Sequence, residues 1–473
     1  MPDFRRRTIL LCFFLAMPWG VSCGPLHNSD LELEYRLRID PGEGILVDMT
    51  ARGLRGKRPG FQILDGIGLL QDQPGHIEGL TARVGGVEVP VSSEEHPEVT
   101  VWSVDRGRTD DVRLRYRVRP YDPDSSPEAS FVGAERAVVL GYSAFLVPSE
   151  ITDYLPVPIR VTVTAPPGWP VWTSWPPAGT GYAPETSHDL WSGGVMAGDF
   201  TETVMETETA RVRVLTEGRA GTPGLSVANR LHPILREMVG LFGAPPRDSV
   251  LDVIALYRVV PVRNGRSLMM GSSEENSFFC VATPDRFDDL EQLTALAAHE
   301  CLHFYLGGAL IGRMEAPYNN APDLIWLIEG VTEYLTYVLM ERAGIITPER
   351  FEAVHEKKRR LVRELGTAQG LSLAAAARSL TDADTYQLVY SKGFLIARYL
   401  DETMAAECGP GSFEASVRDL FESANFYRTH EWITPESVRR VFEARCPGAA
   451  LLIERYAEGN ASVPTMFSTP GAG

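Results

Sequence analysis

The chain of 473 residues is too long for a single hydrophobic core, and about 150 residues per domain predicts about three domains. Its composition, 44% hydrophobic and 23% charged, is typical of globular proteins and excludes disorder as the main state. Lys and Arg number 45 against 62 Asp and Glu, and the net charge of -17 would repel a phosphate backbone, so we expect no nucleic-acid partner. Two short basic runs, Arg52–Arg58 and Lys357–Arg360, are predicted to be solvated surfaces.

The first 22 residues have the order of a secretory signal peptide: basic Arg5–Arg7, then apolar Ile9–Met17, then small residues before Cys23. The apolar stretch is about half as long as a bilayer span requires, so we expect no permanent transmembrane helix. Cys23 after small residues resembles a bacterial lipoprotein cleavage box, which makes it a candidate lipid anchor to a membrane, and the paired arginines leave twin-arginine export as an alternative route. We therefore expect a periplasmic or cell-envelope lipoprotein, with full secretion as the alternative.

Residues 28–216 are predicted to form an N-terminal all-β domain with a saddle-like or sandwich-like arrangement. Short runs in this region alternate apolar with polar residues or are rich in β-branched residues, and turn-forming residues separate them. The clearest predicted strands are Tyr35–Ile39, Val112–Val118, Ala137–Leu140 and Ile159–Val163. The Pro-rich segment Ala165–Trp175 and the segment Trp191–Phe200 are predicted to be loops and edges.

The composition changes near residue 220, where helical patterns begin. Apolar spacing predicts a helix over Leu225–Leu241, and a β-branched run predicts a strand over Val250–Leu256. Helices then dominate from Asp288 to about Tyr456. We expect an α+β domain over residues 222–345, a helical domain over 346–458 and a disordered tail over 459–473, so the chain is predicted to be an α+β multidomain protein.

Four cysteines remain after the predicted signal peptide and Cys23, and in an exported protein they meet an oxidising compartment. Cys408 and Cys446 both lie in turn-forming contexts rich in Gly and Pro, and we predict a disulfide between them. Cys280 and Cys301 are predicted to be thiols of the core.

A His-Glu-x-x-His sequence occupies residues 299–303, within a predicted helix. On a helix, His299 and His303 lie one turn apart and only about 40° from each other around the axis, so both imidazoles can bind the same Zn²⁺. Glu300 lies beside them, where it can take a proton from an attacking water without binding the metal. The alternative is a pair of ordinary core histidines beside a surface glutamate.

A third ligand candidate, Glu329, lies in a predicted helix among large apolar residues. A carboxylate there is costly to bury without a positive partner, and Zn²⁺ would complete a His-His-Glu site with its fourth position open. Gly330 is costly in a helix, which predicts a close backbone approach to the zinc helix. Glu333, one turn after Glu329, can accept a hydrogen bond from the outer ring nitrogen of a zinc-bound histidine; a surface glutamate is the alternative.

Three motifs in this order resemble a known family: His-Glu-x-x-His, then Trp326-Leu-x-Glu-Gly-x-Thr-x-Tyr334, then Tyr390-Ser-Lys-Gly393-Phe-Leu. Together they resemble the gluzincin metallopeptidases, and most closely the glycyl aminopeptidase family, which is related to aminopeptidase N. The segment Pro166-Pro-Gly-Trp-Pro-Val-Trp-Thr is also similar to that family's β domain. The resemblance implies a thermolysin-like catalytic domain within residues 222–345, with the zinc ligands and general base named above.

The resemblance also implies that Tyr390 hydrogen-bonds the oxyanion of the tetrahedral intermediate, a role that requires a preplaced donor. From the residues alone, Tyr386 is an equal candidate, and both tyrosines are otherwise ordinary residues of an amphipathic helix.

Relatives carry a Gly-x-Glu-His-type strand before the zinc helix, and its glutamate can anchor the α-amine of a substrate. This chain has Gly271-Ser-Ser-Glu-Glu instead, so Glu274 and Glu275 are the candidate substrate-binding residues, with exposed strand-end acids as the alternative. Many relatives also end in a PDZ domain, whereas the residues after Asp401 are predicted to be helices and a tail.

The sequence thus predicts an exported zinc metallopeptidase that acts on peptides. Aminopeptidase action on small N-terminal residues is the first hypothesis, and endopeptidase action is an alternative. A peptide-binding surface lipoprotein that has lost catalysis is the alternative from another class. A β-domain interaction module with a purely structural zinc is disfavoured, because structural sites normally close all four positions with protein ligands and no fourth ligand is found.

Overall fold

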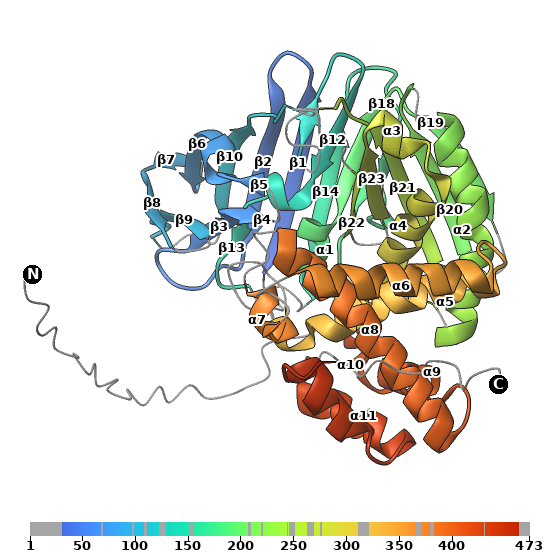
Figure 1. Cartoon of the computed structure of the whole chain (residues 1–473). Coiled ribbons are helices and arrows are strands. Elements are labelled where there is room, and N and C mark those ends of the chain that lie inside the picture. Colours follow the sequence, from blue (N-terminus) through green and yellow to red (C-terminus); the bar gives the residue numbers. More distant parts are fainter. Residues whose placement is uncertain are drawn as a thin grey trace, which may run out of the picture.

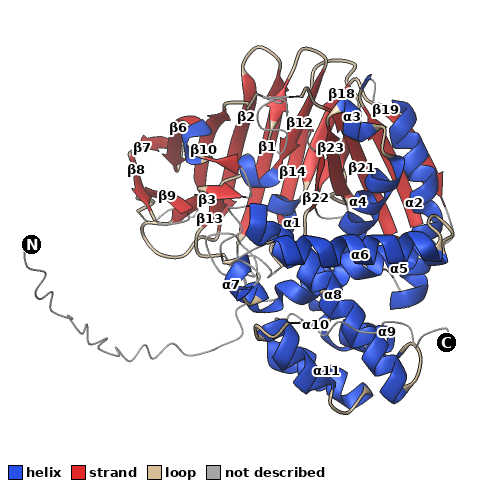
Figure 2. Ribbon diagram, viewed as in Figure 1, coloured by secondary structure: helices blue, strands red, loops and turns tan. Residues whose placement is uncertain are grey.

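The computed structural model describes residues 31–462 apart from fifteen short segments (68–69, 97–98, 108–110, 123–128, 152–155, 207–209, 219–220, 244, 246–250, 263–268, 275–276, 311–320, 366–369, 379–382 and 430). The predicted signal peptide, Cys23 and most of the predicted tail lie outside the described residues. Strands occupy the N-terminal part of the molecule and helices its C-terminal part, as Figures 1 and 2 show, which confirms the predicted α+β class.

The N-terminal region is organised around an eight-stranded sheet. Its spatial order is β16 (Pro177–Ala178), β17 (Gly181–Tyr182), β14 (Ile159–Thr164), β1 (Glu32–Asp40), β2 (Gly44–Arg52), β10 (Val112–Val118), β6 (Ile77–Val84) and β7 (Val87–Val89). Side chains alternate along β10: Leu114 and Tyr116 are buried, whereas Arg113 and Arg115 face solvent. This period of two is the one expected of a strand with one face on the core.

Smaller sheets cover the buried face of this sheet. One has the order β11 (Phe131–Val132), β12 (Arg136–Leu140), β18 (Gly194–Gly198), β15 (Val171–Thr173), and another has the order β13 (Val147–Pro148), β3 (Gly60–Leu64), β9 (Val99–Val104), β8 (Val91–Glu95). The ribbon β4 (Gly66–Ile67) and β5 (Leu70–Gln71) and the helix α1 (Ser187–Ser192) complete the region. The hydroxyls of Tyr35 and Tyr116 hydrogen-bond the backbone of residues 144–146 within this core.

The prediction of loops and edges over Trp191–Phe200 is wrong. Within it, β18 is a fully buried strand between β12 and β15. Three of its five residues are Gly or Ala, and a Cβ on Gly198 would lie 2.2 Å from the carbonyl oxygen of Glu135. The strand therefore lacks the bulky alternating pattern that predicts strands, because neighbouring backbone fills the space.

A five-stranded sheet joins the two regions. Its order is β19 (Thr201–Glu206), β20 (Ala210–Thr216), β21 (Leu251–Val259), β23 (Ser277–Ala282), β22 (Met269–Glu274). Ile254 and Leu256 of β21 pack on the β-rich core, whereas Val253 and Tyr257 pack on the helical core. Because β19 and β20 pair into this sheet, the chain enters the second region before residue 216, where the predicted domain boundary lies.

Helices cover the other face of this sheet and continue beyond it (Figure 1). They are α2 (Gly221–Phe242), α3 (Pro284–Phe287), α4 (Leu290–His303), α5 (Thr332–Arg342), α6 (Pro348–Glu364), α7 (Leu373–Ala377), α8 (Ala383–Cys408), α9 (Ser412–Ala424), α10 (Phe426–Thr429), α11 (Pro435–Arg445) and α12 (Ala449–Leu452). Wider or tighter helical turns named η4 (Phe304–Ala309), η5 (Pro322–Leu324), η6 (Trp326–Val331) and η8 (Ile453–Glu458) extend several of them. No helix among the described residues is long and apolar enough to cross a membrane.

Gly330 does mark a close approach of two helices, but the partner is not the zinc helix that the sequence predicted. A Cβ on Gly330 would lie 2.6 Å from the Cα of Gly393 on α8. Two residues without side chains thus meet where η6 crosses α8. This contact brings Tyr390, one turn before Gly393, to the same side of α8 as Glu329.

Candidate metal centre

The last turns of α4 place the side chains of His299 and His303 next to each other. Asp289 caps the helix by accepting a hydrogen bond from the backbone of Gln292, and residues such as Leu293 bury its inner face. One turn separates the two histidines, whose Nε2 atoms lie 3.0 Å apart. His299 is only 4% exposed, so this helix carries its polar motif inside the protein.

Glu329 reaches the same point from η6. Its Oε2 atom lies 3.2 Å from Nε2 of His299 and 3.5 Å from Nε2 of His303. Around a tetrahedral zinc with bonds near 2.05 Å, ligand atoms would be about 3.3 Å apart. The three ligand atoms therefore have the spacing that a zinc ion requires, and among the described residues they form the cluster able to hold a metal.

The outer ring nitrogens of both histidines have partners that leave the Nε2 atoms for a metal. Nδ1 of His299 lies 3.1 Å from Oε2 of Glu333, and Nδ1 of His303 lies 3.2 Å from the carbonyl oxygen of Leu306. That carbonyl turns back because the helix ends in an irregular turn at Gly307, where φ is +141°. Such orienting partners are typical of metal-binding histidines.

Lys358 of α6 adds a partner that sequence reasoning missed. Its Nζ lies 2.5 Å from Oε1 of Glu333, and its side chain is only 13% exposed. The prediction that the whole run Lys357–Arg360 is solvated is therefore wrong at this position. The missed signal was a lysine that lies one helical turn after the buried Val354. Lys358 thus contacts Glu333, and Glu333 contacts His299, in a continuous series of charged side chains.

The electrostatics of the cluster favour a cation. Burial lowers the pKa of His299, but hydrogen bonds and charges from Glu329 and Glu333 outweigh it and raise that pKa to about 10. Burial raises the pKa of Glu329, but the two histidines hold it well below its usual range. Burial likewise raises the pKa of Glu333, while Lys358 and His299 lower it to about 2. Two buried carboxylates thus stabilise positive charge on the histidines, and a divalent metal satisfies the same arrangement.

Glu300 lies on the sheet side of the cluster. It is only 6% exposed, and a Cβ on Gly271 would lie 2.6 Å from its Oε1 atom. Gly271 belongs to β22, the edge strand of the five-stranded sheet. The absent side chain of Gly271 therefore makes room for the Glu300 carboxylate beside the metal ligands.

Tyr390 reaches the cluster from α8. Its ring centroid is 5.7 Å from that of His299, and the ring of Tyr386 stacks on it at 4.5 Å. Burial first, and then the charge of Glu329, raise the pKa of Tyr390 well above its usual range, so its hydroxyl keeps its proton. A protonated phenol beside the cluster can donate a hydrogen bond to a negative oxygen.

The other predicted site residues have different outcomes. Glu274 ends β22, and the structure describes its backbone position only, whereas Glu275 lies outside the described residues. Cys408 and Cys446 are joined by a disulfide with a Cα–Cα distance of 5.6 Å, which ties the end of α8 to the end of α11. Cys280 and Cys301 are buried free thiols.

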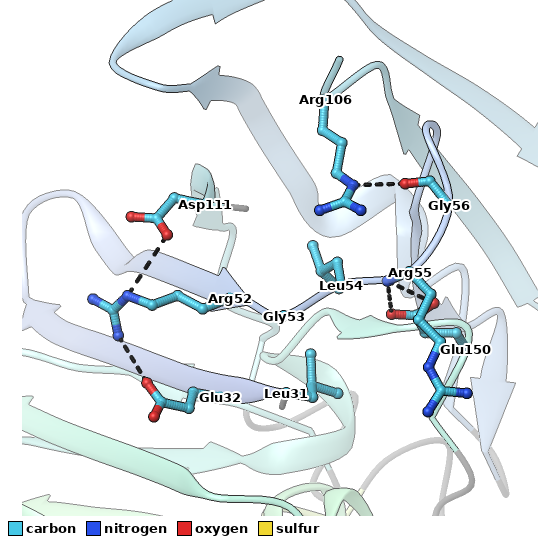
Figure 3. Close-up of a pocket in the computed structure, with 10 residues that line it drawn as sticks. All are labelled: Leu31, Glu32, Arg52, Gly53, Leu54, Arg55, Gly56, Arg106, Asp111 and Glu150. Carbon is cyan, nitrogen blue, oxygen red and sulfur yellow. Dashed lines mark hydrogen bonds and ion pairs between the residues drawn. The ribbon is translucent and has the colours of Figure 1, made fainter. Parts of the chain in front are cut away.

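A cavity of about 750 Å³ lies far along the chain from this cluster, on the N-terminal sheet (Figure 3). Its charged lining is paired internally: Arg52 lies 3.8 Å from Asp111 and 3.4 Å from Glu32, and the backbone of Arg55 donates to Glu150 at 2.8 Å. We therefore assign the chemistry to the His299–His303–Glu329 cluster rather than to this cavity.

Two histidines one turn apart, a glutamate from a following helix and an α+β scaffold define the gluzincin class of zinc metallopeptidases. A sequence model described as M61 glycyl aminopeptidase matches residues 292–396, and one described as the peptidase M61 N-terminal domain matches residues 64–199. The chain belongs to this glycyl aminopeptidase family. No curated protein matches its sequence closely enough to add to this assignment.

Solved structures share the fold. An aminopeptidase N family protein from Idiomarina loihiensis has a TM-score of 0.76 at 19% identity, over 91% of this chain and 77% of that one. An M1 zinc metallopeptidase from Deinococcus radiodurans has a TM-score of 0.59 at 16% identity, over 92% and 96%. Yeast LTA4 hydrolase in complex with bestatin also has a TM-score of 0.59 at 16% identity, over 92% and 68%. At these identities the likeness describes the fold alone.

Proposed function

We propose that this protein is an exported aminopeptidase that uses zinc to hydrolyse the first peptide bond of substrates with small N-terminal residues. The observation that carries the proposal is the convergence of three ligand atoms from His299, His303 and Glu329, 3.0 to 3.5 Å apart, in a buried and negatively charged setting. These three residues would hold the zinc. When bound, zinc would act as a Lewis acid and lower the pKa of water at the open position.

The protein's own residues supply the proton transfers. Glu300, buried beside the ligands against Gly271, would accept a proton from the attacking water and pass it to the leaving amine. Tyr390, which keeps its proton, would donate a hydrogen bond to the oxygen that becomes negative as the carbonyl turns tetrahedral. Glu300 contacts β22 and Tyr390 belongs to α8, so the two groups reach the cluster from different elements and a peptide bond bound at the cluster would meet both.

Aminopeptidase action rests on the family and on the position of Glu274 at the end of the edge strand. Two related structures hold a peptide or an amino acid: a variant of the Deinococcus radiodurans metallopeptidase is bound to a Tyr-Ser-Ala substrate, and a two-domain M1 zinc metallopeptidase variant is bound to L-tryptophan. In this chain Glu274 or Glu275 would pair with the substrate's α-amine. Export and lipidation at Cys23 rest on the signal-like N-terminus.

The direct test combines zinc content with a panel of aminoacyl fluorogenic amides. We expect about one zinc per chain and turnover of small aminoacyl groups. Glu300→Gln should keep the zinc and lower kcat by about 10² to 10⁴, the range for a lost general base. Gly271→Ala is the matched variant: its new methyl would displace the Glu300 carboxylate without touching a metal ligand, so it should also lower kcat and keep the zinc.

Each negative result would contradict a different part of the proposal. Full activity of Glu300→Gln would contradict the mechanism. Turnover of internally quenched peptides alone would show an endopeptidase. Bound zinc with no turnover of either panel would favour a peptide-binding protein. Cys23→Ser tests the anchor separately: it should release the protein from the membrane fraction and abolish incorporation of labelled fatty acid.

A further inference from the structure

A second tyrosine lies beside Tyr390, and the proposed chemistry leaves it without a role. Tyr386 and Tyr390 are four residues apart on α8, so they share one face of the helix. Their rings stack with centroids 4.5 Å apart and an interplanar angle of 28°. The Tyr390 ring in turn lies at 31° to that of His299, so three rings follow one another outward from the metal ligands.

The exposure of the two tyrosines differs along this series. Tyr386 is 47% exposed, whereas Tyr390 is half-buried. Exposure of a large aromatic side chain at this level is uncommon in this protein, where most Phe, Tyr and Trp side chains of the described residues are buried or half-buried. Tyr386 therefore lies at the outer end of the series, at the opening to solvent.

The hydroxyls of the pair also interact. Partial burial is the main cause that raises the pKa of both phenols, and a hydrogen bond between them raises the pKa of Tyr390 further while it lowers that of Tyr386. The negative charges of Glu329 and Glu300 also raise both pKa values.

We propose that Tyr386 is a positioning residue that acts through Tyr390. In the resting state the Tyr386 oxygen accepts a hydrogen bond from the Tyr390 hydroxyl, and the stacked Tyr386 ring keeps the Tyr390 side chain in place. When a substrate oxygen becomes negative, Tyr390 turns its proton to that oxygen and accepts a hydrogen bond from Tyr386 instead, since each hydroxyl can donate and accept. Hydrogen bonds in such a chain strengthen one another, so the Tyr386 hydroxyl makes the Tyr390 hydroxyl a stronger donor. This inference rests on the proposed peptidase function.

The test is a double-mutant cycle on the zinc-loaded protein with its best fluorogenic amide. Tyr386→Phe keeps the stacked ring and removes only the hydroxyl. We expect kcat to fall about fivefold, the factor of one neutral hydrogen bond, with KM, zinc content and Tm unchanged. In the Tyr390→Phe background the same substitution should change kcat by less than about twofold, because the residue through which it acts is gone. Tyr386→Ala, which also removes the stacked ring, should lower kcat further.

The outcomes separate the two proposals. If wild-type protein turns over and Tyr386→Phe has the same kcat, the role of Tyr386 is overturned and the function stands. An equal loss in both backgrounds also overturns it, since Tyr386 would then act independently of Tyr390. If zinc-loaded wild-type protein cleaves no peptide, the proposed function fails and the inference fails with it.

Discussion

Two ion pairs, one in each region of the molecule, differ sharply in their exposure to solvent. On the eight-stranded sheet, Arg115 and Asp48 form an ion pair at 3.6 Å, and their side chains are 64% and 56% exposed. In the helical region, Lys358 and Glu333 form a pair at 2.5 Å, and their side chains are 13% and 14% exposed. The Arg115–Asp48 pair thus lies on the surface, whereas the Lys358–Glu333 pair supports the metal-binding residues through His299.

This difference matters because solvent decides what an ion pair contributes. Exposed pairs typically contribute between zero and about 1 kcal/mol, because water screens them. A buried pair adds little over apolar side chains of the same shape, but loss of one partner costs about 3 to 5 kcal/mol because the other charge remains buried. The Lys358–Glu333 pair should therefore be the more sensitive of the two, and it should matter for the metal site as well as for the fold.

The largest expected effect is that of Lys358→Met. It leaves the Glu333 carboxylate buried without its cation, so we expect the free energy of unfolding to fall by about 3 kcal/mol or more. Zinc affinity should fall as well, because Glu333 orients His299. Chemical denaturation and a zinc competition assay measure the two effects.

A second variant serves as the control for this substitution. Lys358→Met combined with Glu333→Gln removes the unpaired charge and keeps a hydrogen-bond acceptor for His299, so most of the stability should return. If Lys358→Met alone is as stable as the wild type, the pair is not buried in solution and the comparison between the regions fails.

The disulfide has the next largest effect, on stability alone. Cys408 and Cys446 are separated by 38 residues, and a cross-link over a loop of this length stabilises by up to about 4 kcal/mol in the chain-entropy model. The double substitution Cys408→Ala/Cys446→Ala should lower Tm without a change in kcat, because the bond lies at the far end of α8 from Tyr390. A reductant should destabilise the wild type and leave the double variant unchanged; equal sensitivity of both would contradict the prediction.

Zinc binding should depend on pH. A zinc-binding histidine must be neutral, whereas Glu329 and Glu333, acting against burial, hold the pKa of His299 at about 10 in the protein without metal. Binding at neutral pH therefore releases a proton, and zinc stabilisation should increase with pH. Each proton released corresponds to about 1.4 kcal/mol per pH unit. The rise in Tm on zinc addition, measured between pH 5.5 and 7.5, should grow with pH; a constant rise would contradict the electrostatics.

Much of the fold and the site could be predicted from sequence, for reasons that differ by region. Alternation along β10 and the spacing of His299 and His303 are local patterns, and local patterns predict strands and one-turn pairs directly. Buried β18 was missed because its small residues are specified by neighbouring backbone. Lys358 and the carbonyl of Leu306 were missed because their partners come from other elements or from an irregular turn, and no periodicity encodes either contact.

A substitution at the close contact between Gly330 and Gly393 should have a smaller effect on stability, and it should also affect activity. Gly393→Ala would place a methyl 2.6 Å from the Cα of Gly330, and such overpacking costs about 1 to 3 kcal/mol. Because Tyr390 lies one turn away, kcat should fall as well, with zinc retained. Gly240→Ala on α2, where nothing lies within 4 Å, is the matched control and should be neutral or slightly stabilising. Equal behaviour of the two variants would mean that the close approach is absent in solution.

The smallest effect is expected on the sheet, and it is the one that completes the comparison. Arg115→Met removes one partner of the exposed pair with Asp48, so the free energy of unfolding should change by less than about 0.5 kcal/mol. Both groups remain hydrated, so no charge is left buried. Raising the salt concentration should erase even this difference, whereas the deficit of Lys358→Met should persist, because buried charges are screened much less. A loss above about 2 kcal/mol at Arg115 would show that exposure is the wrong criterion for separating the two regions.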